Sequence, residues 1–256
     1  MTPREQITAA IRAANDRDEP ALVAFLTAGY PSRERFREHL TAIASSADVV
    51  EIGVPFSDPT ADGLTIQRSS RIALEQGVNL KWILSELEAM PRVKAPLLLM
   101  SYMNPLLNFG FDRLPEAAVR AGVAGFIVPD LPLDESDEMR EALDTQGLAL
   151  IQMVTRVTEP ERLKMVCAAG SGFLYAVTMT GTTGNTVNVP PDVIEYLDNV
   201  RAHSPVPVCA GFGIRSSEQV RRLKGHVDGV IVGSALVEKL EQGEDVAKWL
   251  RTLRLS

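Results

Sequence analysis

The sequence has few of the residues that hold metal ions or form disulfides. It contains two cysteines, Cys167 and Cys209, and three histidines among its 256 residues. The cysteines lie far apart and neither belongs to a C-x-x-C pair, so the chain shows no zinc or redox motif. The histidines (His39, His203 and His226) fall on expected helices or helix ends. We therefore expect no metal site.

Excess basic charge and long apolar runs are also lacking. Asp and Glu number 33 against 26 Lys and Arg, and the pI is near 5.1. This balance argues against nucleic-acid binding, which needs a basic face, although backbone amides can still bind a phosphate group. The longest apolar runs, such as 96–100, are too short to span a membrane. Residues 2–5 (Thr-Pro-Arg-Glu) are typical of a helical capping box rather than a signal peptide, so we expect a cytoplasmic protein.

Short apolar runs alternate with stretches of helical spacing along the whole chain. Hydrophobic residues make up 45% of the sequence, enough for one sizeable core. The runs predict strands at 21–27, 48–54, 96–101, 124–129, 148–153, 172–178, 206–210 and 228–232. Eight such units without a linker favour a single (β/α)8 barrel domain over residues 1–256, with an extra N-terminal helix. An open, doubly wound parallel sheet is the alternative.

One charged residue interrupts an otherwise apolar strand. Glu51 lies within Asp48–Val54, where an ionised carboxylate must be paired, desolvated at a cost of several kcal/mol, or raised in pKa. A second carboxylate, Asp62, follows in the next loop. The two together could supply an acid and a base for proton transfer. The structural alternatives are a buried ion pair or backbone contact for Glu51 and an ordinary turn before glycine for Asp62. Asp130, at a strand end, is ambiguous.

Glycine-rich segments follow the last three expected strands, at 180–186, 211–216 and 233–234. In a barrel the active site lies at the C-terminal ends of the strands, and the loops after strands seven and eight often bind phosphate. Glycine lets backbone N–H groups approach a phosphate closely, and a helix N-terminus adds favourable partial charge. Any one of these loops alone fits a tight turn, but three together favour a phosphate site.

Aromatic and aliphatic residues near the strand ends have two interpretations. Tyr102 and Tyr175 fit core aromatics with hydroxyl groups at the barrel rim. The same choice between barrel core and pocket lining applies to other apolar residues, namely Phe25, Leu99, Ile127, Phe212 and Ile231. Periodicity does not separate the two.

The segment from Glu51 to Gly63 (Glu-Ile-Gly-Val-Pro-Phe-Ser-Asp-Pro-Thr-Ala-Asp-Gly) resembles the signature of the tryptophan synthase alpha chain family. Further segments agree with it, at 25–31, 99–105, 128–132, 175–184, 211–214 and 232–235. The resemblance covers nearly the whole chain. It implies a (β/α)8 barrel that cleaves indole-3-glycerol phosphate by a retro-aldol reaction, without metal or organic cofactor, to indole and glyceraldehyde 3-phosphate.

The resemblance also implies a role for individual residues. Glu51 would be the general acid and base, and Asp62, more solvated and ionised, would accept a hydrogen bond from the indole N–H. The phosphate would be held by Gly184, Gly213, Gly233 and Ser234. The substrate would be surrounded by Phe25, Tyr102, Ile127, Tyr175, Phe212 and Ile231, with Thr183 on a closing loop. Ile127 stands where the family suggests Leu, a mild change of shape.

The family resemblance further implies a partner, a beta chain that carries pyridoxal phosphate and receives the indole, in a heterotetramer of two alpha and two beta chains. Contacts with it would involve Asp58, Pro59, Asn104 and Asn108. Two departures affect regulation more than chemistry: Leu64 stands where Pro is expected, which suggests a more mobile loop, and Thr178-Met179 replaces a more polar pair. Three alternatives stay open, namely a stand-alone lyase, a catalytically weak activating subunit and an unrelated phosphate-binding isomerase.

Overall fold

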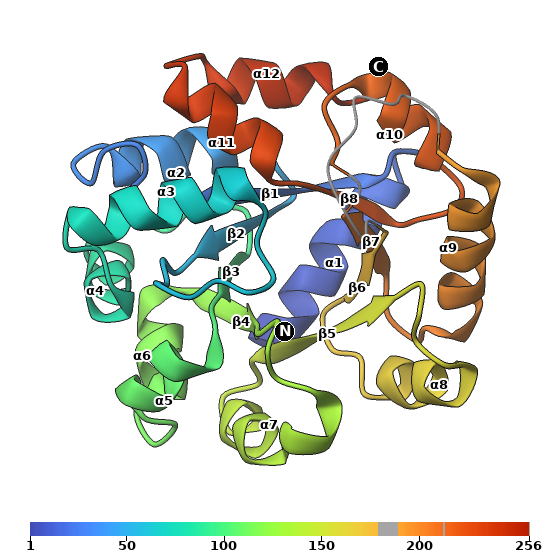
Figure 1. The fold of residues 1–256 in the computed structure, drawn as a ribbon, viewed down its shortest axis with the longest axis horizontal. Helices are drawn as coiled ribbons and strands as arrows, with labels where there is room; N and C mark the ends of the chain where they lie inside the picture. Colours follow the sequence, from blue (N-terminus) through green and yellow to red (C-terminus); the bar gives the residue numbers. More distant parts are fainter. Residues whose placement is uncertain (179–188, 212, 256) are drawn as a thin grey trace.

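Eight parallel strands form a closed barrel in chain order, with the helices in a ring around them (Figure 1). The computed structural model describes residues 1–178, 189–211 and 213–255. The predicted site residues Thr183, Gly184 and Phe212, and also Met179, lie outside the described residues. The closed order β1 to β8 confirms the predicted barrel, and the open doubly wound sheet is excluded.

Each predicted strand is present, with both ends within two residues of the expected positions. The strands are β1 (Ala21–Thr27), β2 (Val49–Gly53), β3 (Leu97–Met100), β4 (Val123–Ile127), β5 (Ala149–Thr155), β6 (Leu174–Val177), β7 (Val208–Gly211) and β8 (Gly229–Val232). Helices cover their outer faces, so both faces are buried and the strands read as nearly continuous apolar runs.

The helices in the described part of the chain follow the strands in the expected alternation. They are α1 (Pro3–Asn15), α2 (Phe36–Ala44), α3 (Leu64–Glu75), α4 (Leu80–Ala89), α5 (Met103–Phe109), α6 (Leu114–Ala121), α7 (Asp137–Asp144), α8 (Pro160–Ala168), α9 (Pro191–His203), α10 (Ser217–Leu223), α11 (Ser234–Glu241) and α12 (Val246–Thr252), with a 3-10 turn η1 (Leu133–Glu135). None of these described helices combines the length and the apolar character that a membrane crossing requires.

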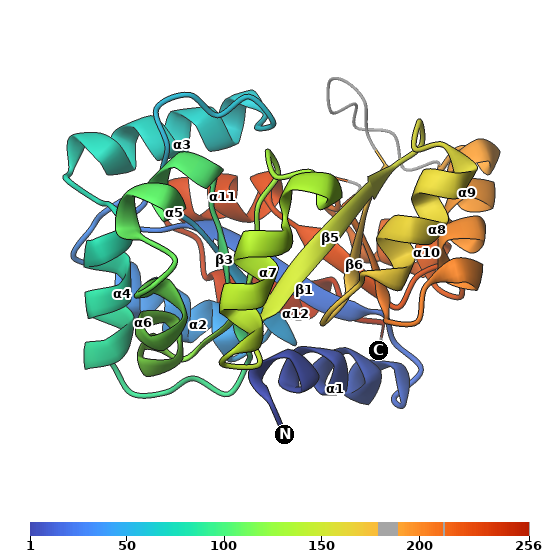
Figure 2. The same cartoon turned by 90° about the horizontal axis from the view of Figure 1, so that it is seen from below.

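The extra helix α1 closes one end of the barrel. Thr2 and Glu5 form the predicted capping box, and Pro3 occupies the first helical position. Ile7 and Ile11 are fully buried and belong to the same apolar cluster as the barrel interior. Figure 2 shows α1 beneath the barrel and α3 at the opposite end. The N-terminal ends of the strands are therefore covered, and the site must open at their C-terminal ends.

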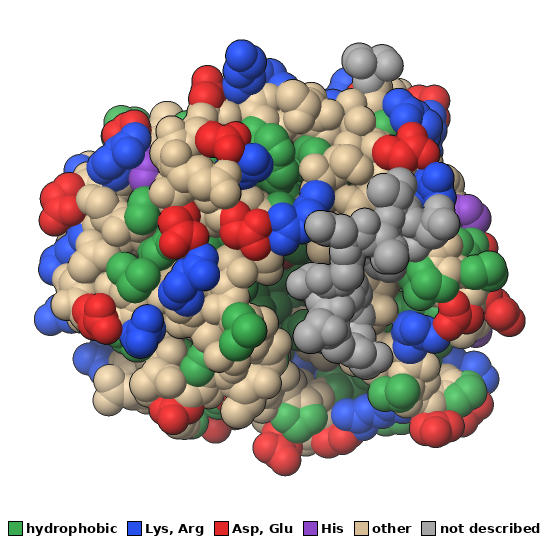
Figure 3. Space-filling view, turned by 45° about the horizontal axis from the view of Figure 1, so that its top comes forward, with side chains coloured by type: hydrophobic (Ala, Val, Ile, Leu, Met, Phe, Trp, Pro, Cys, Tyr) green, Lys and Arg blue, Asp and Glu red, His purple; other side chains and the backbone are tan. Residues whose placement is uncertain are grey.

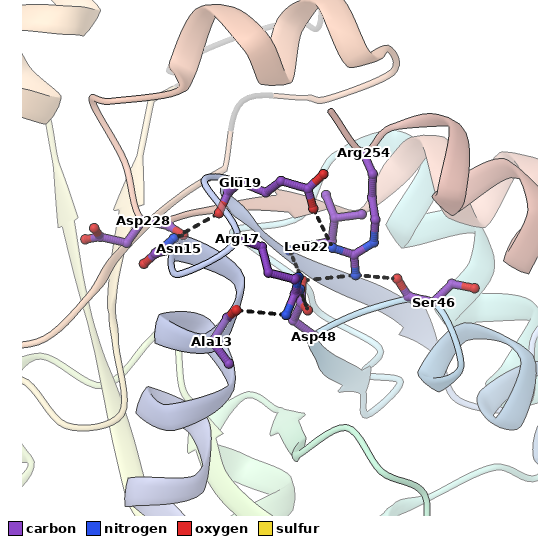
Figure 4. Close-up of polar contacts among 9 residues, drawn as sticks. All are labelled: Ala13, Asn15, Arg17, Glu19, Leu22, Ser46, Asp48, Asp228 and Arg254. Atoms are coloured by element: carbon purple, nitrogen blue, oxygen red, sulfur yellow. Dashed lines mark hydrogen bonds and ion pairs between the residues drawn. The ribbon is translucent and has the colours of Figure 1, made fainter. Parts of the chain in front are cut away.

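Charged side chains tie the chain terminus to the covered end of the barrel (Figure 4). The carboxylate of Asp48, just before β2, accepts the backbone N–H of Leu22 at 2.8 Å and a guanidinium N–H of Arg254 at 3.1 Å. Arg254 also donates to the carbonyl of Ser46 at 2.8 Å and lies 3.5 Å from Glu19. Because these contacts join the α1–β1 loop, β1, the α2–β2 loop and the segment after α12, they hold the covered end together.

Candidate active site

Glu51 lies in β2 and faces the barrel interior together with its register neighbours Phe25 and Leu98. Only 1% of the residue is exposed, and its Oε1 atom has no hydrogen-bond partner among the described residues. Burial disfavours the charged form and raises the pKa of the carboxyl from 4.5 to about 8. Glu51 therefore keeps its proton at neutral pH. Within the described residues, the structural alternative of a buried ion pair finds no support.

Asp62 lies in the loop between β2 and α3 and is held by its backbone. Its N–H donates to the carbonyl of Pro59 at 3.3 Å, and its own carbonyl accepts the Gln67 side-chain amide at 2.8 Å. Burial raises the pKa of the carboxyl to about 6, against the lowering effect of a hydrogen bond from Tyr102. The side chain of Asp62 is half-buried, and it is more solvated than that of Glu51. Its pKa still stays below that of Glu51, so Asp62 is mostly ionised near pH 7.

Tyr102 connects the Asp62 loop to the end of β3. Its hydroxyl oxygen accepts the N–H of Ala61 at 2.9 Å while the hydroxyl group bonds to the Asp62 carboxylate. Its ring stacks on Phe56, with the centroids 5.1 Å apart. The sequence left Asp130 ambiguous, and in the structure its carboxylate accepts the N–H of Met103 at 2.9 Å. Asp130 thereby caps the start of α5 directly after Tyr102 and helps to fix the ring.

Tyr175 on β6 lies near enough to both Glu51 and Asp62 to interact with each carboxyl group electrostatically. Desolvation raises the pKa of its hydroxyl, and the charges of Glu51 and Asp62 raise it further. The ring lies close against β7, because a Cβ at Gly211 would be 2.8 Å from the Tyr175 hydroxyl oxygen. Tyr175 therefore remains a neutral hydrogen-bonding group beside the acid pair.

The predicted phosphate residues in the described part lie after β7 and β8. Gly213 has a φ of +64°, a conformation that favours glycine. Gly233 caps α11, and Ser234 is the first residue of that helix. Among the described residues, the one atom within 4 Å of a Cβ at Gly233 would be the Cβ of Phe25, at 3.9 Å, so the described residues leave room beside Gly233. The first N–H groups of α11 lack a carbonyl one turn earlier, and together with this room they suit an anion.

The predicted apolar lining residues are close-packed. Ile127 is fully buried, Ile231 is 4% exposed and Phe25 is 6% exposed. Phe25 also explains a glycine, because a Cβ at Gly53 would lie 2.5 Å from its ring. Met100 on β3 was not predicted as a lining residue, yet it packs against the clusters that contain Ile127 and Phe25. Its spacing of two from Leu98, on the inward face, is the signal that could have found it.

Together these residues offer a protonated carboxylic acid, an ionised carboxylate, two neutral tyrosines and the predicted anion site at one end of a barrel. Such a set suits proton transfers within a phosphorylated substrate. Among the described residues, no group of three or more His, Cys, Asp and Glu side chains is placed to hold a metal ion, and both cysteines are buried and free.

Comparison with known proteins identifies the family. The sequence profile described as "Tryptophan synthase alpha chain" matches residues 11–254. The tryptophan synthase alpha chain of Nitratidesulfovibrio vulgaris (strain DP4) is 44% identical over 243 residues, which cover 94% of this chain and 95% of that one. The chain belongs to the tryptophan synthase alpha chain family.

Other members of the alpha chain family give the same result. An alpha chain of Bacillus cereus is 40% identical over 248 residues, or 95% of this chain and 96% of that one. A solved structure of Mycobacterium tuberculosis tryptophan synthase superposes with a TM-score of 0.89 at 34% identity, covering 96% of both chains. The alpha subunit from Legionella pneumophila str. Paris gives 0.87 at 29% identity, covering 99% of this chain and 97% of that one.

The residues predicted to contact a beta chain lie on the surface near the open end. Asp58 is exposed in the β2–α3 loop, and Pro59 beside it is partly buried. Asn104 and Asn108 are both exposed on α5. Leu107, on the same helix, is 52% exposed. Each of the four predicted contact residues is at least partly exposed, and their contact with a beta chain stays a prediction.

Leu64, which stands where proline was expected, does not lie in the loop as the sequence suggested. It is the first residue of α3 rather than part of the loop, and it is 83% exposed. A proline here would act on the helix start and not on the loop itself. Thr178 donates its hydroxyl to the carbonyl of Gly211.

Proposed function

We propose that this chain, as one domain of residues 1–256, is the alpha subunit of tryptophan synthase. In this role it cleaves indole-3-glycerol phosphate to indole and glyceraldehyde 3-phosphate. Membership of the family supplies the reaction. The observation that carries the residue assignment is Glu51, a fully buried carboxyl that keeps its proton near neutral pH in the strand before Asp62.

Glu51 is suited to both proton transfers of a retro-aldol cleavage. One proton must be added to the indole ring carbon that bears the glycerol chain, and one must leave the hydroxyl on the adjacent chain carbon. The carbon–carbon bond then breaks, and the hydroxyl carbon becomes the aldehyde. A carboxyl with a pKa of about 8 delivers the first proton at pH 7, and the resulting carboxylate accepts the second. The group returns to its starting state without another acid or base.

Asp62 is suited to the charge that develops on the ring. Protonation of the ring carbon places positive charge on the indole nitrogen, and the ionised Asp62 carboxylate would accept a hydrogen bond from that N–H. Tyr102 holds Asp62 in place by the hydrogen bond already described. The two carboxyls divide the work because burial is greater for Glu51 than for Asp62.

The remaining proposals concern binding. Gly213, Gly233 and Ser234, with Gly184 outside the described residues, would hold the phosphate through backbone N–H groups. We propose no cofactor for this chain, since Glu51 can perform both proton transfers. Pyridoxal phosphate would belong to the beta chain of a cytoplasmic heterotetramer of two alpha and two beta chains. On the face seen in Figure 3, basic and acidic side chains are interspersed, which gives no basic surface for nucleic acid.

Steady-state cleavage of indole-3-glycerol phosphate, with and without a tryptophan synthase beta chain, tests the proposal. Slow turnover that rises strongly with the beta chain would support the subunit role. Fast turnover alone would favour a stand-alone lyase instead. Glu51→Gln should remove nearly all turnover while glycerol 3-phosphate still binds. Equal activity of the variant and the wild type would refute the catalytic assignment.

A further inference from the structure

Two neighbouring helices beside the candidate site, α3 and α11, are joined by polar side chains. Glu238 on α11 receives two N–H groups from the Arg215 guanidinium, at 2.7 and 3.0 Å, and its Oε1 atom also lies 3.4 Å from the Thr65 hydroxyl on α3. One turn along both helices, Arg68 on α3 pairs with Glu241 on α11. The spacing of three residues on each helix places both contacts on facing sides.

The first contact lies where the parts of the site meet. Glu238 comes four residues after Ser234, so it lies on the same side of α11 as the start of the helix, one turn farther along. Arg215 comes two residues after Gly213, the predicted phosphate glycine of the β7 loop. Glu238 therefore binds the β7 loop to the helix that follows β8, the two segments proposed to hold the phosphate.

The other end of the connection reaches the proposed catalytic loop. Thr65 lies in the first turn of α3, three residues after Asp62, and Gln67 in the same helix holds the Asp62 carbonyl at 2.8 Å. α3 and α11 pack side by side (Figure 1). The second contact includes the β1 loop, because the Tyr30 hydroxyl also hydrogen-bonds Glu241 and Arg68. These contacts thus connect α11 to the start of α3, the helix whose Gln67 holds the Asp62 carbonyl.

We propose that Glu238 is a positioning residue that couples phosphate binding at α11 to the placement of Asp62 through Thr65 and α3. The inference rests on the proposed function. A phosphate that orders the start of α11 fixes Glu238, and the contact with Thr65 then fixes the turn that carries Asp62. The indole end of the substrate is held by Asp62, so each end of the substrate favours the arrangement that binds the other.

Calorimetric titration of glycerol 3-phosphate, in the absence and presence of saturating indole, measures this coupling directly. In the wild type, indole should strengthen glycerol 3-phosphate binding by about fivefold, and the reverse titration should give the same factor. Glu238→Gln keeps the shape of the side chain but weakens the paired contacts, and should reduce the factor to less than about twofold. A purely structural role would change the melting temperature and leave the factor unchanged.

Two further variants keep the test decisive. Thr65→Val removes only the α3 side of the contact, leaves the Arg215 pair intact, and should also reduce the coupling factor. Glu218→Gln is the matched control, because Glu218 pairs with Arg221 on α10, and it should keep the wild-type factor. An unchanged factor in both Glu238→Gln and Thr65→Val overturns the proposal, as does a wild type without coupling. Failure of the wild type to bind either ligand would instead reject the proposed function on which the inference rests.

Discussion

Replacement of Glu51 by Gln should abolish catalysis and stabilise the protein. The folded state raises the pKa of Glu51 from 4.5 to about 8 because the carboxyl is buried without a partner for Oε1 among the described residues. Its contribution to stability is therefore fully present below pH 4.5 and is lost as the pH rises through about 8. At pH 7 Glu51 is ionised in the unfolded chain and protonated in the folded chain. This difference lowers the free energy of unfolding.

The magnitude follows from the two pKa values. A pH of 7 lies 2.5 units above the unfolded pKa of 4.5. At about 1.4 kcal/mol for each pH unit, the ionisable carboxyl of Glu51 lowers the free energy of unfolding at pH 7 by about 3 kcal/mol. The same calculation gives about 1 kcal/mol at pH 5.5 and about 4 kcal/mol at pH 8. Glutamine has nearly the same shape and does not ionise, so its advantage over Glu51 should grow over this range. The increase with pH is diagnostic, because the extra amide N–H group of glutamine adds a constant cost.

Urea unfolding of both proteins at several pH values between 5.5 and 8 measures this difference. Glu141→Gln, which replaces an exposed carboxylate on α7, is the control and should show no pH-dependent difference. A constant difference between the Glu51→Gln variant and the wild type would show that Glu51 ionises equally in both states. Desolvation would then not raise the pKa of Glu51 in the folded state, and Glu51 would lose its assignment as the acid.

The other predictions concern the groups around the acid pair. Tyr102→Phe removes a hydrogen bond that lowers the pKa of Asp62, so the acidic limb of the kcat/KM profile should move to higher pH and kcat/KM at pH 7 should fall by roughly three- to tenfold; an unmoved limb would contradict this. Gly233→Asp should weaken glycerol 3-phosphate binding by at least about tenfold in titration calorimetry, because it places a carboxylate at the N-cap of α11, while indole binding stays unchanged. Leu64→Pro should stabilise the fold by about 0.5–1 kcal/mol in urea unfolding, because this exposed residue is the first of α3 and the preceding Gly63 is already extended; a loss of stability would show that the helix start needs the Leu64 N–H.

The barrel could be predicted from the sequence because each strand is covered on both faces. Burial on both faces makes the strands short apolar runs, and β2 (Val49–Gly53) is recognisable even with one carboxylate inside it. Loop chemistry was harder to predict. The pKa of Asp62 depends in part on a hydrogen bond from Tyr102, which follows a different strand, and no local pattern contains that contact. Leu64 was placed in a loop, since the sequence around Gly63 has no side chain that marks a helix start.

Contacts between distant segments account for what the sequence did not reveal. Asp130 is 27 residues from the N–H group of Met103 that it caps, and Glu238 is 173 residues from Thr65. Glu238 reads as an ordinary polar position on an amphipathic helix. Its position four residues after Ser234 was visible in the sequence, but its meaning depends on the packing of α11 against α3.

Two acids three residues apart show why the site lies at one end of the barrel. Asp48 precedes β2 at the end covered by α1, and its carboxylate accepts N–H groups from Leu22, Arg17 and Arg254. Glu51 lies on the same strand toward the open end, and its Oε1 atom has no partner among the described residues. The charge of Asp48 is paired and stabilises the fold, whereas the charge of Glu51 is suppressed and its proton is available for transfer. From sequence spacing alone, both residues are acids at a buried strand, and nothing distinguishes the structural carboxylate from the catalytic one. The direction of the strand decides between them, because the side chains that satisfy a carboxylate lie at one end of the barrel and the open space for a substrate lies at the other.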